Sequence, residues 1–343
     1  MPTHAPSRIL IVRTSAMGDV VHTLPLATAL RRHFPAARIG WVVERHFAPL
    51  LGEFSPVDEV LEVALRAWRR RPLARSTWRE LTGFLRRLHA FAPELVIDAM
   101  GNHKAALLGA VSLAERRLGA RRGDRREPSS SIWLSEQVAL TGEHAVDRTL
   151  SLLRGLGVEP DQVDFGGPEI LASARAHEPT PPLLIHPGAG WRNKEYPPER
   201  WSQVANLLTA ATGLELGVLS GPGEEGLARE VSELSTATKV VSAPSLASLV
   251  AHLRRARLLL AGDTGPLHLA EAVGTPVVCV LGPTDPARNG AYAAGGPLVD
   301  NIAHVLPCSF CYQRLDEAKA CLLAIEPAKI ADRAEAILER SKD

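Results

Sequence analysis

Short apolar runs alternate with longer amphipathic segments along most of this 343-residue chain. Seven of the runs have the length and composition of buried strands: 8–12, 38–43, 94–99, 183–185, 214–219, 258–261 and 276–281. Strands that alternate with helices in this way are typical of parallel sheets joined by right-handed helical crossovers. The pattern therefore predicts an α/β fold.

A proline-rich segment, 173–182, divides the chain almost in half. It contains Glu178-Pro-Thr-Pro-Pro182, and prolines resist helix formation and lack the amide hydrogen that a sheet needs. Strand and helix patterns begin again beyond it. We expect two Rossmann-like domains, 1–172 and 183–343, joined by the linker 173–182, with parallel sheets that face a central cleft and bind ligands at the carboxyl ends of their strands. The final helix is a candidate to pack back on the first domain.

Composition narrows the class of protein. Thirty-nine Lys and Arg residues against thirty-eight Asp and Glu residues give a formal net charge of +1, so attraction to an anionic partner needs a local patch, and no nucleic-acid partner is expected. No apolar segment approaches the length of a membrane span, and the N-terminus lacks the apolar core of a secretory signal. The four cysteines do not resemble the framework of a small disulfide-rich domain. We expect a cytoplasmic protein with reduced thiols.

The stretch 65–89 departs from the alternating pattern because arginines interleave with apolar residues. The arginines stand at positions 66, 69, 70, 71, 75, 79, 86 and 87, and the apolar residues include Trp68, Leu73, Trp78 and Phe84. One interpretation is a solvated helix face, and the other is a platform for anionic lipid headgroups or phosphorylated sugars. A second basic run, 116–126, is a phosphate-binding surface or a solvated loop.

Asp19 stands where the first predicted strand gives way to a helical pattern, in Arg13-Thr-Ser-Ala-Met-Gly-Asp19. Pro25 fits a helix only near its start, so we expect the main helix to begin close to it. Asp19 has two interpretations. It caps the helix and satisfies free amides, which is the commoner role of Asp at such a turn, or it is a general base presented to a substrate hydroxyl.

A loop with two glycines and a cation follows the predicted strand 183–185. It consists of Leu184-Ile-His-Pro-Gly-Ala-Gly190 and then Trp191-Arg-Asn-Lys194. Its glycine spacing is neither that of a dinucleotide fingerprint nor that of a Walker loop, so a hydride-transfer enzyme is poorly supported. Lys194 is either a surface lysine or a cation that pairs with a diphosphate.

The sharpest local signal is the turn Asp263-Thr264-Gly265-Pro266, where a strand ends and a proline opens a helix. Amides at such a helix start form an anion site together with Thr264 and Gly265, and fixed donors there stabilise a departing diphosphate. His268, in the first turn, is either a buried structural residue or a phosphate contact.

Two acidic residues, Glu224 and Glu225, follow the predicted strand 214–219 and the glycine-containing segment Ser220-Gly-Pro-Gly. A carboxylate at the end of a strand can accept hydrogen bonds from both hydroxyls of a ribose. The alternative is an acidic pair that complements the dipole of the helix that begins there.

Several segments match a known pattern when they are taken together. They are Thr14-Ser-Ala-Met-Gly-Asp-Val-Val-His-Thr-Leu-Pro25, Trp41-Val-Val-Glu44, Ile97-Asp-Ala-Met-Gly101, His186-Pro-Gly-Ala, Lys194 and Gly262-Asp-Thr-Gly-Pro-Leu-His-Leu269. In this order, over nearly the whole chain, they resemble the lipopolysaccharide heptosyltransferases of glycosyltransferase family nine, and the heptosyltransferase I group most. The resemblance implies the GT-B fold, with the nucleotide-sugar bound mainly by the C-terminal domain.

The same resemblance implies a reaction. It is the inverting, metal-independent transfer of L-glycero-D-manno-heptose from ADP-heptose to the Kdo of Kdo-lipid A, with no cofactor, at the cytoplasmic face of a Gram-negative inner membrane. Residue roles follow: Asp19 would deprotonate the acceptor hydroxyl. The donor would be held by Lys194, Asp263, Thr264, Gly265, Pro266 and His268, with Glu225 or Glu224 on the ribose, and the acceptor by Arg66, Arg69, Arg70 and Arg126.

Two departures from the family pattern stand out. Ala16 occupies a position where the family often has Ser. Cys308, Cys311 and Cys321 resemble the cysteine-bearing tail of some other members but lack a fourth cysteine. Three thiols are an incomplete zinc set that only His304 could complete, which leaves metal binding by the tail open.

Two other functions fit the sequence. A related family-nine transferase, such as heptosyltransferase II or a transferase of another glycoconjugate, would use a different donor or acceptor, and the basic stretch with Trp68 favours the Kdo-lipid acceptor. A nucleotide-binding regulator without catalysis is of a different class, and the presence of both Asp19 and Lys194 argues against it.

Overall fold

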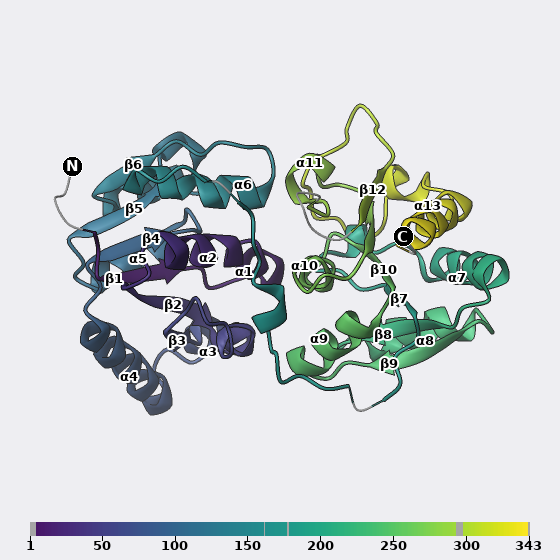
Figure 1. Ribbon diagram of the computed structural model, residues 1–343, viewed down its shortest axis with the longest axis horizontal. Coiled ribbons are helices and arrows are strands. Elements are labelled where there is room, and N and C mark those ends of the chain that lie inside the picture. The colour runs from purple at the N-terminus through teal and green to yellow at the C-terminus, as the bar shows by residue number, and fades with distance from the viewer. Residues whose placement is uncertain (1–4, 161, 177, 293–297, 342–343) are drawn as a thin grey trace. The chain divides into compact units, whose positions relative to one another are not determined.

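The chain divides into two compact units in the computed structural model, Met1–Leu171 and Ala172–Asp343 (Figure 1). The structure describes residues 5–160, 162–176, 178–292 and 298–341. Each unit contains a six-stranded sheet whose paired strands are all parallel. The α/β fold is therefore confirmed. The division places the proline-rich segment 173–182 at the start of the second unit.

The first unit is built on a sheet with the strand order β3-β2-β1-β4-β5-β6. Its strands are β1 (Arg8–Val12), β2 (Arg38–Glu44), β3 (Glu59–Val63), β4 (Leu95–Asp98), β5 (Arg116–Ala120) and β6 (Glu136–Val138). Its helices are α1 (Met17–Val21), α2 (Leu24–His33), α3 (Leu65–Arg70), α4 (Arg75–Phe91), α5 (His103–Val111) and α6 (Ala145–Leu150). Shorter 3-10 turns are η1 (Arg45–Leu51), η2 (Arg122–Asp124), η3 (Pro128–Trp133), η4 (Ser151–Leu156) and η5 (Gly167–Glu169).

Helices cover both faces of this sheet because its central strand is apolar on both sides. Leu10 and Val12 pack in one cluster with Phe84 and Leu88 of α4. Successive side chains of a strand point to opposite faces, so the equally buried Ile11 lies on the other face. A strand buried on both faces explains why the run 8–12 is continuously apolar.

The second unit repeats the plan with the strand order β12-β11-β10-β7-β8-β9. Its strands are β7 (Leu183–His186), β8 (Leu216–Ser220), β9 (Thr238–Ser242), β10 (Leu258–Gly262), β11 (Val277–Leu281) and β12 (Val299–Ala303). Its helices are α7 (Pro198–Thr212), α8 (Glu225–Glu233), α9 (Leu246–Arg255), α10 (Gly265–Ala272), α11 (Pro286–Asn289), α12 (Ala320–Leu323) and α13 (Pro327–Arg340), with the 3-10 turn η6 (Arg192–Lys194).

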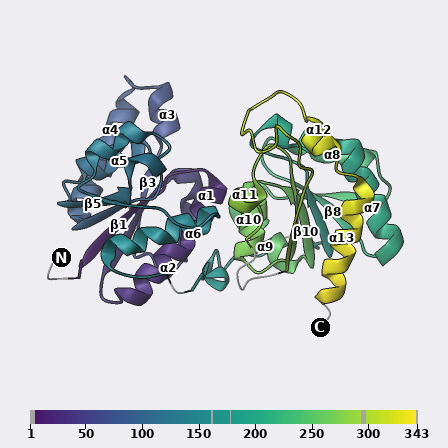
Figure 2. The ribbon, with the colours of Figure 1, turned by 90° about the horizontal axis from the view of Figure 1, so that it is seen from above.

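The last helix belongs to the core of the second unit. Ile330, Ala334 and Ile337 of α13 are buried in one cluster with Trp201 of α7 and with strands of the sheet. Figure 2 shows α13 and α7 as neighbours within this unit. The apolar face of the final helix is therefore covered by its own unit.

All seven predicted strands are present, with ends that differ by a few residues, but five further strands were not predicted: β3, β5, β6, β9 and β12. Four of these five are the edge strands of the two sheets. An edge strand is partly exposed, so polar residues interrupt the apolar run that the prediction relies on. In β5 the strand begins with two arginines, and Arg116 pairs with Glu136 of β6 at 2.7 Å.

Two helical patterns are divided in the structure. The pattern after the first strand forms α1 and then α2, in which Pro25 is near the start as expected. The basic stretch 65–89 forms α3 and α4, separated by residues 71–74 that include Pro72. In the part of the chain that the structure describes, no helix is both long enough and apolar enough to cross a membrane.

Candidate functional site

The strand order places the predicted site residues at the carboxyl ends of the central strands of each sheet. In the second unit the order changes direction between β7 and β10, and in the first between β1 and β4. Loops that leave two adjacent strands in opposite directions open a crevice at such a switch point, where α/β proteins bind their ligands. Lys194 and Asp263 follow β7 and β10, whereas Asp19 follows β1.

Lys194 and Asp263 form a buried ion pair at the switch point of the second sheet. The Nζ of Lys194 lies 2.6 Å from Oδ2 of Asp263, and both side chains are largely covered. The ammonium also lies 4.4 Å from the centre of the Trp191 ring. The structure thus brings together two predicted donor residues that are 69 positions apart in the chain. Lys194 is not a free surface lysine.

His268 extends this pair into a chain of buried charges. Its Nε2 lies 3.3 Å from Oδ1 of Asp263, and its Nδ1 lies 3.0 Å from Oε2 of Glu271. Burial by itself disfavours the imidazolium, but the hydrogen bonds and charges of the two carboxylates outweigh it and raise the pKa of His268 to about 9. The histidine is therefore cationic at neutral pH.

Asp263 is held as an anion by the same contacts. Burial raises its pKa, but the hydrogen bond from His268 and the charge of Lys194 outweigh burial and lower the pKa to about 2. Glu271 behaves differently, since burial dominates and its pKa is raised. Its other oxygen accepts a short hydrogen bond from the Tyr292 amide.

The start of α10 adds neutral donors to this site. Thr264 is the N-cap residue of the helix, and Pro266 occupies its first turn. The Thr264 hydroxyl is buried and has no hydrogen-bond partner within the part of the chain that the structure describes. Amides at the start of a helix also lack partners within the helix. The turn Thr264-Gly265 thus presents donors beside two cations, which is the arrangement that binds a phosphate.

Glu224 and Glu225 differ although they are adjacent. Glu224 accepts a hydrogen bond from the Gly221 amide at 3.0 Å and lies 3.1 Å from Nε2 of His186. Burial raises its pKa, but the contacts with His186 and Gly221 outweigh burial and lower it. Glu225 points to solvent and contacts the Gly223 amide at 3.2 Å. Because Glu224 contacts His186, the last residue of β7, its carboxylate is held beside the loop that follows β7, whereas Glu225 contacts its own loop and helix.

Asp19 lies at the switch point of the first sheet, where two contacts orient its carboxylate. Its Oδ1 lies 2.5 Å from a guanidinium nitrogen of Arg13, and its Oδ2 accepts a hydrogen bond from the Ala16 amide at 3.1 Å. Asp19 is the third residue of α1 and Ala16 is the N-cap, so the carboxylate satisfies a backbone amide without being the cap itself. Nearly half of its side chain, 46%, remains exposed.

The predicted acceptor arginines all point to solvent but lie in different segments. Arg66, Arg69 and Arg70 are exposed on α3, which follows β3. Arg126 is exposed beside the Gly101 loop, which follows β4. All four therefore lie beyond the carboxyl ends of the first sheet.

The second basic run, by contrast, is not a uniform phosphate surface. Arg125 is fully buried and lies 2.5 Å from Asp98. Asp98 also accepts hydrogen bonds from the Met100 and Gly101 amides. The pair fixes the loop that carries Arg126.

The cysteine-bearing tail does not form a metal cluster. Within the described residues, no group of three or more His, Cys, Asp or Glu side chains is arranged to hold a metal ion. Cys308 and Cys311 are exposed free thiols, and Cys321 is half-buried. The possible zinc set of these thiols with His304 is therefore not assembled.

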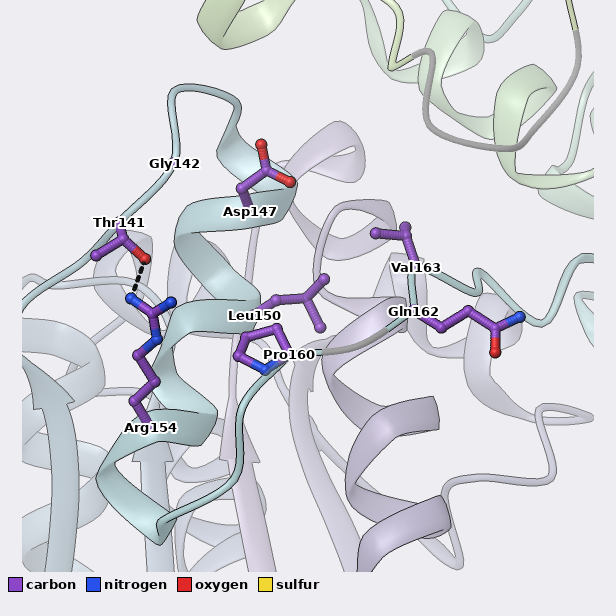
Figure 3. A pocket seen from close by; sticks show the side chains of 8 residues that line it. All are labelled: Thr141, Gly142, Asp147, Leu150, Arg154, Pro160, Gln162 and Val163. Carbon is purple, nitrogen blue, oxygen red and sulfur yellow. Dashed lines mark hydrogen bonds between the residues drawn. The ribbon is translucent and has the colours of Figure 1, made fainter.

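A separate hollow lies in the first unit beside α6 and η4 (Figure 3). Its lining residues are Thr141, Gly142, Asp147, Leu150, Arg154, Pro160, Gln162 and Val163. The Arg154 side chain donates a hydrogen bond to the Thr141 hydroxyl at 2.7 Å. None of the predicted site residues lines this hollow.

Sequence reasoning missed several residues that the structure adds. Glu271 stands three positions after His268, a spacing that brings two side chains together on a helix and was available in the sequence. His186 and Arg13 were seen within motifs, but their contacts with Glu224 and Asp19 depend on tertiary structure. Arg314 lies 4.7 Å from the Trp191 ring, and no sequence signal pointed to that contact.

Comparisons with known proteins identify similar chains. The family model described as glycosyltransferase family 9 (heptosyltransferase) matches residues 81–320. The lipopolysaccharide heptosyltransferase 1 of Pseudomonas aeruginosa is 32% identical, over 96% of this chain and 98% of that protein.

Solved structures agree with the sequence matches. The structure of Escherichia coli heptosyltransferase WaaC with ADP is 28% identical and superposes with a TM-score of 0.81, over 96% of this chain and 99% of that chain. The same enzyme with ADP-2-deoxy-2-fluoro heptose gives a TM-score of 0.78 with the same identity and coverage.

The raised pKa of His268 predicts a loss of stability at alkaline pH. The folded-state pKa of about 9 lies above the ordinary value of 6.5, so the histidine stabilises the fold fully below pH 6.5 and loses this contribution as the pH rises to about 9. Over this pH range we expect the free energy of unfolding of wild type to fall by roughly 3 kcal/mol more than that of His268→Gln. Urea unfolding of both proteins at several pH values measures this difference. Parallel pH profiles of the two proteins would contradict a cationic His268.

Proposed function

Since the chain belongs to glycosyltransferase family 9, the heptosyltransferase family, we propose that it transfers L-glycero-D-manno-heptose from ADP-heptose to the Kdo sugar of Kdo-lipid A. The donor is supported by the similar WaaC structures, whose ligands are ADP and ADP-2-deoxy-2-fluoro heptose. The observation that carries the proposal is the cluster of Lys194, His268 and the start of α10 at a switch point. A diphosphate is the anion that this cluster fits best.

The donor diphosphate lies, in this proposal, against Lys194 and the turn Asp263-Thr264-Gly265-Pro266. The unpartnered Thr264 hydroxyl and the helix amides donate hydrogen bonds to phosphate oxygens. Lys194 interacts with the diphosphate while Asp263 keeps the ammonium in place. As the bond between the sugar and the phosphate breaks, negative charge grows on the leaving ADP, and these fixed donors stabilise it more than they stabilise the bound donor.

His268 acts on the diphosphate through Asp263 rather than by direct contact. It contacts Asp263 directly and is cationic, so it offsets the carboxylate and leaves the field of Lys194 available to the diphosphate. Lys194, whose charge is left available in this way, and the start of α10 supply positive potential to the departing diphosphate. We therefore propose that the transfer proceeds without a metal ion.

Glu224 is the residue that we assign to the ribose. One of its oxygens is occupied by His186 and the Gly221 amide. The other lies toward Gly188, where a Cβ atom would stand 2.3 Å from Oε1, so only glycine leaves room there. A carboxylate fixed in this way accepts hydrogen bonds from adjacent ribose hydroxyls. Glu225, which is exposed, is the weaker candidate.

Asp19 is the proposed general base. Arg13 and the Ala16 amide orient its carboxylate, and its exposed part is open to an acceptor hydroxyl. Asp19 takes the proton of that hydroxyl, and the acceptor oxygen attacks the anomeric carbon on the face opposite the leaving ADP. The new bond forms as the bond to the phosphate breaks, and ADP departs with the electron pair. A single displacement of this kind inverts the anomeric configuration.

The acceptor is assigned to the arginines of the first unit. Arg66, Arg69, Arg70 and Arg126 are exposed cations beyond the carboxyl ends of its sheet, and they suit the carboxylates and phosphates of Kdo-lipid A. Such an acceptor resides in a membrane. We therefore propose that the protein works in the cytoplasm, peripherally bound to the inner membrane.

Replacing Asp19 tests the general base. Asp19→Ala should retain ADP binding but lose transfer, with turnover lower by about 10²–10⁴-fold. Asp19→Asn keeps the shape of the side chain and its contact with the Ala16 amide, so it separates loss of the base from loss of local structure. ADP affinity from calorimetry and product formation from the same preparations give the two quantities. Turnover of Asp19→Asn near that of wild type would show that Asp19 is not the base.

Glu224 and Glu225 provide a matched pair of variants. Glu224→Gln should weaken ADP binding by about tenfold, because a charged acceptor loses its bond to the ribose, whereas Glu225→Gln should bind as wild type does. Calorimetry with 2′,3′-dideoxy-ADP identifies the lost contact, since this nucleotide should bind wild type and Glu224→Gln equally. Equal effects of the two substitutions on ADP would overturn the assignment.

A further inference from the structure

Two large apolar side chains are exposed to solvent where α3 leads into α4, a segment (residues 66–79) that we call the α3–α4 turn. Leu73 is 88% exposed and Trp78 is 54% exposed. The core of the unit does not need them, because α4 buries Phe84, Leu88 and Phe91 on a different side of the helix. Leu73 and Trp78 are five positions apart in the chain and both lie at the start of α4, which makes this end a candidate interaction surface.

The charges around these two residues are all of one sign. Exposed arginines stand at positions 66, 69, 70, 71, 75 and 79, and no acidic residue occurs between Glu62 and Glu80. Both of those glutamates lie within ion-pair distance of Arg45, at 3.4 and 2.9 Å. Within the described ranges, none of the six arginines forms an ion pair with an acidic side chain. In a chain of net charge +1, this turn is therefore a strong local concentration of positive charge.

The turn is also held in a fixed shape. Trp68 of α3 donates a hydrogen bond to Glu80 of α4 at 3.0 Å, and its ring lies 6.2 Å from that of Phe84. The Thr77 hydroxyl donates to the Arg71 carbonyl at 2.7 Å. Figure 2 shows α3 and α4 beside one another in the first unit. Leu73 and Trp78 are thus presented on a rigid support rather than on a free loop.

We propose that this turn docks the protein on an anionic lipid bilayer, with Leu73 and Trp78 inserted at the interface and with Arg71, Arg75 and Arg79, which the acceptor assignment leaves free, against the headgroup phosphates. Tryptophan favours the boundary between headgroups and acyl chains, and cationic side chains around an apolar tip are typical of proteins that lie on membranes. An acidic protein partner would satisfy the arginines but would not need an apolar tip between them. Only the identity of the membrane rests on the proposed function; bilayer binding does not.

Sedimentation with vesicles tests the docking directly. The full-length protein should sediment with vesicles of phosphatidylcholine and phosphatidylglycerol, bind less as salt is added, and fail to bind pure phosphatidylcholine. The double variant Leu73→Ser/Trp78→Ser should bind the anionic vesicles about tenfold more weakly, since two apolar side chains are lost from the interface. Leu234→Ser/Val305→Ser is a matched control, because these side chains are 52% and 69% exposed in the second unit.

Two results would overturn the docking site. One is wild type that stays in solution with anionic vesicles. The other is a Leu73→Ser/Trp78→Ser variant that sediments like wild type. Circular dichroism of both double variants checks that each is folded.

A transfer assay separates docking from the reaction. With the acceptor in vesicles, kcat/KM of Leu73→Ser/Trp78→Ser should fall about tenfold, whereas with a water-soluble, deacylated acceptor it should equal that of wild type. An equal fall with both acceptors would contradict a docking role. If no transfer occurs with either acceptor, the proposed function fails while the sedimentation result still decides the docking site.

Discussion

The ion pair between Lys194 and Asp263 is the interaction on which the second unit's site depends. Burying each charged group costs several kcal/mol of hydration free energy. The attraction between the two groups offsets this cost only if their remaining polar atoms also form hydrogen bonds. The imidazolium of His268 donates such a bond to Asp263 and another to Glu271. This chain of alternating charges thus keeps a lysine and an imidazolium together at the carboxyl ends of β7 and β10.

The parallel sheet explains where these charges are found. Helical crossovers bring successive strands back in the same direction, so polar loops gather at the carboxyl ends while the strands themselves stay apolar. β7 and β10 are neighbours in the sheet, where Leu183 lies beside Leu258, although these two residues are 75 positions apart in the chain. The same plan in the first unit puts the Asp19 loop next to the loop that begins at Asp98. Each unit offers one chemically distinct half of the proposed reaction.

The sequence predicted those parts of the fold whose signal is local. Strands that are buried on both faces, such as β1 and β10, are continuous apolar runs, so they were identified with nearly correct ends. Edge strands such as β9 and β12 were missed because solvent on one side allows polar residues within them. The place of α13 depends on which apolar surface remains uncovered, and no local pattern carries that information.

The candidate site divides in a similar way. Motifs identified Lys194, Asp263 and Asp19, and the structure supplies the partners that orient them. The contact between His186 and Glu224 joins residues 38 positions apart and distinguishes Glu224 from its neighbour. The sequence left open whether the second basic run is a phosphate-binding surface or a solvated loop, and Arg125 fits neither, because its side chain is buried beside Asp98. Sequence thus identified the chemical groups, and tertiary contacts assign their charges and orientations.

The most direct test of the account is incubation of the purified protein with ADP-heptose and Kdo-lipid A, followed by mass spectrometry of the lipid. The account predicts a lipid heavier by one heptose residue and an equal amount of ADP released. ADP binding without any gain in lipid mass would contradict it, and would indicate a nucleotide-binding protein that does not transfer heptose to this acceptor.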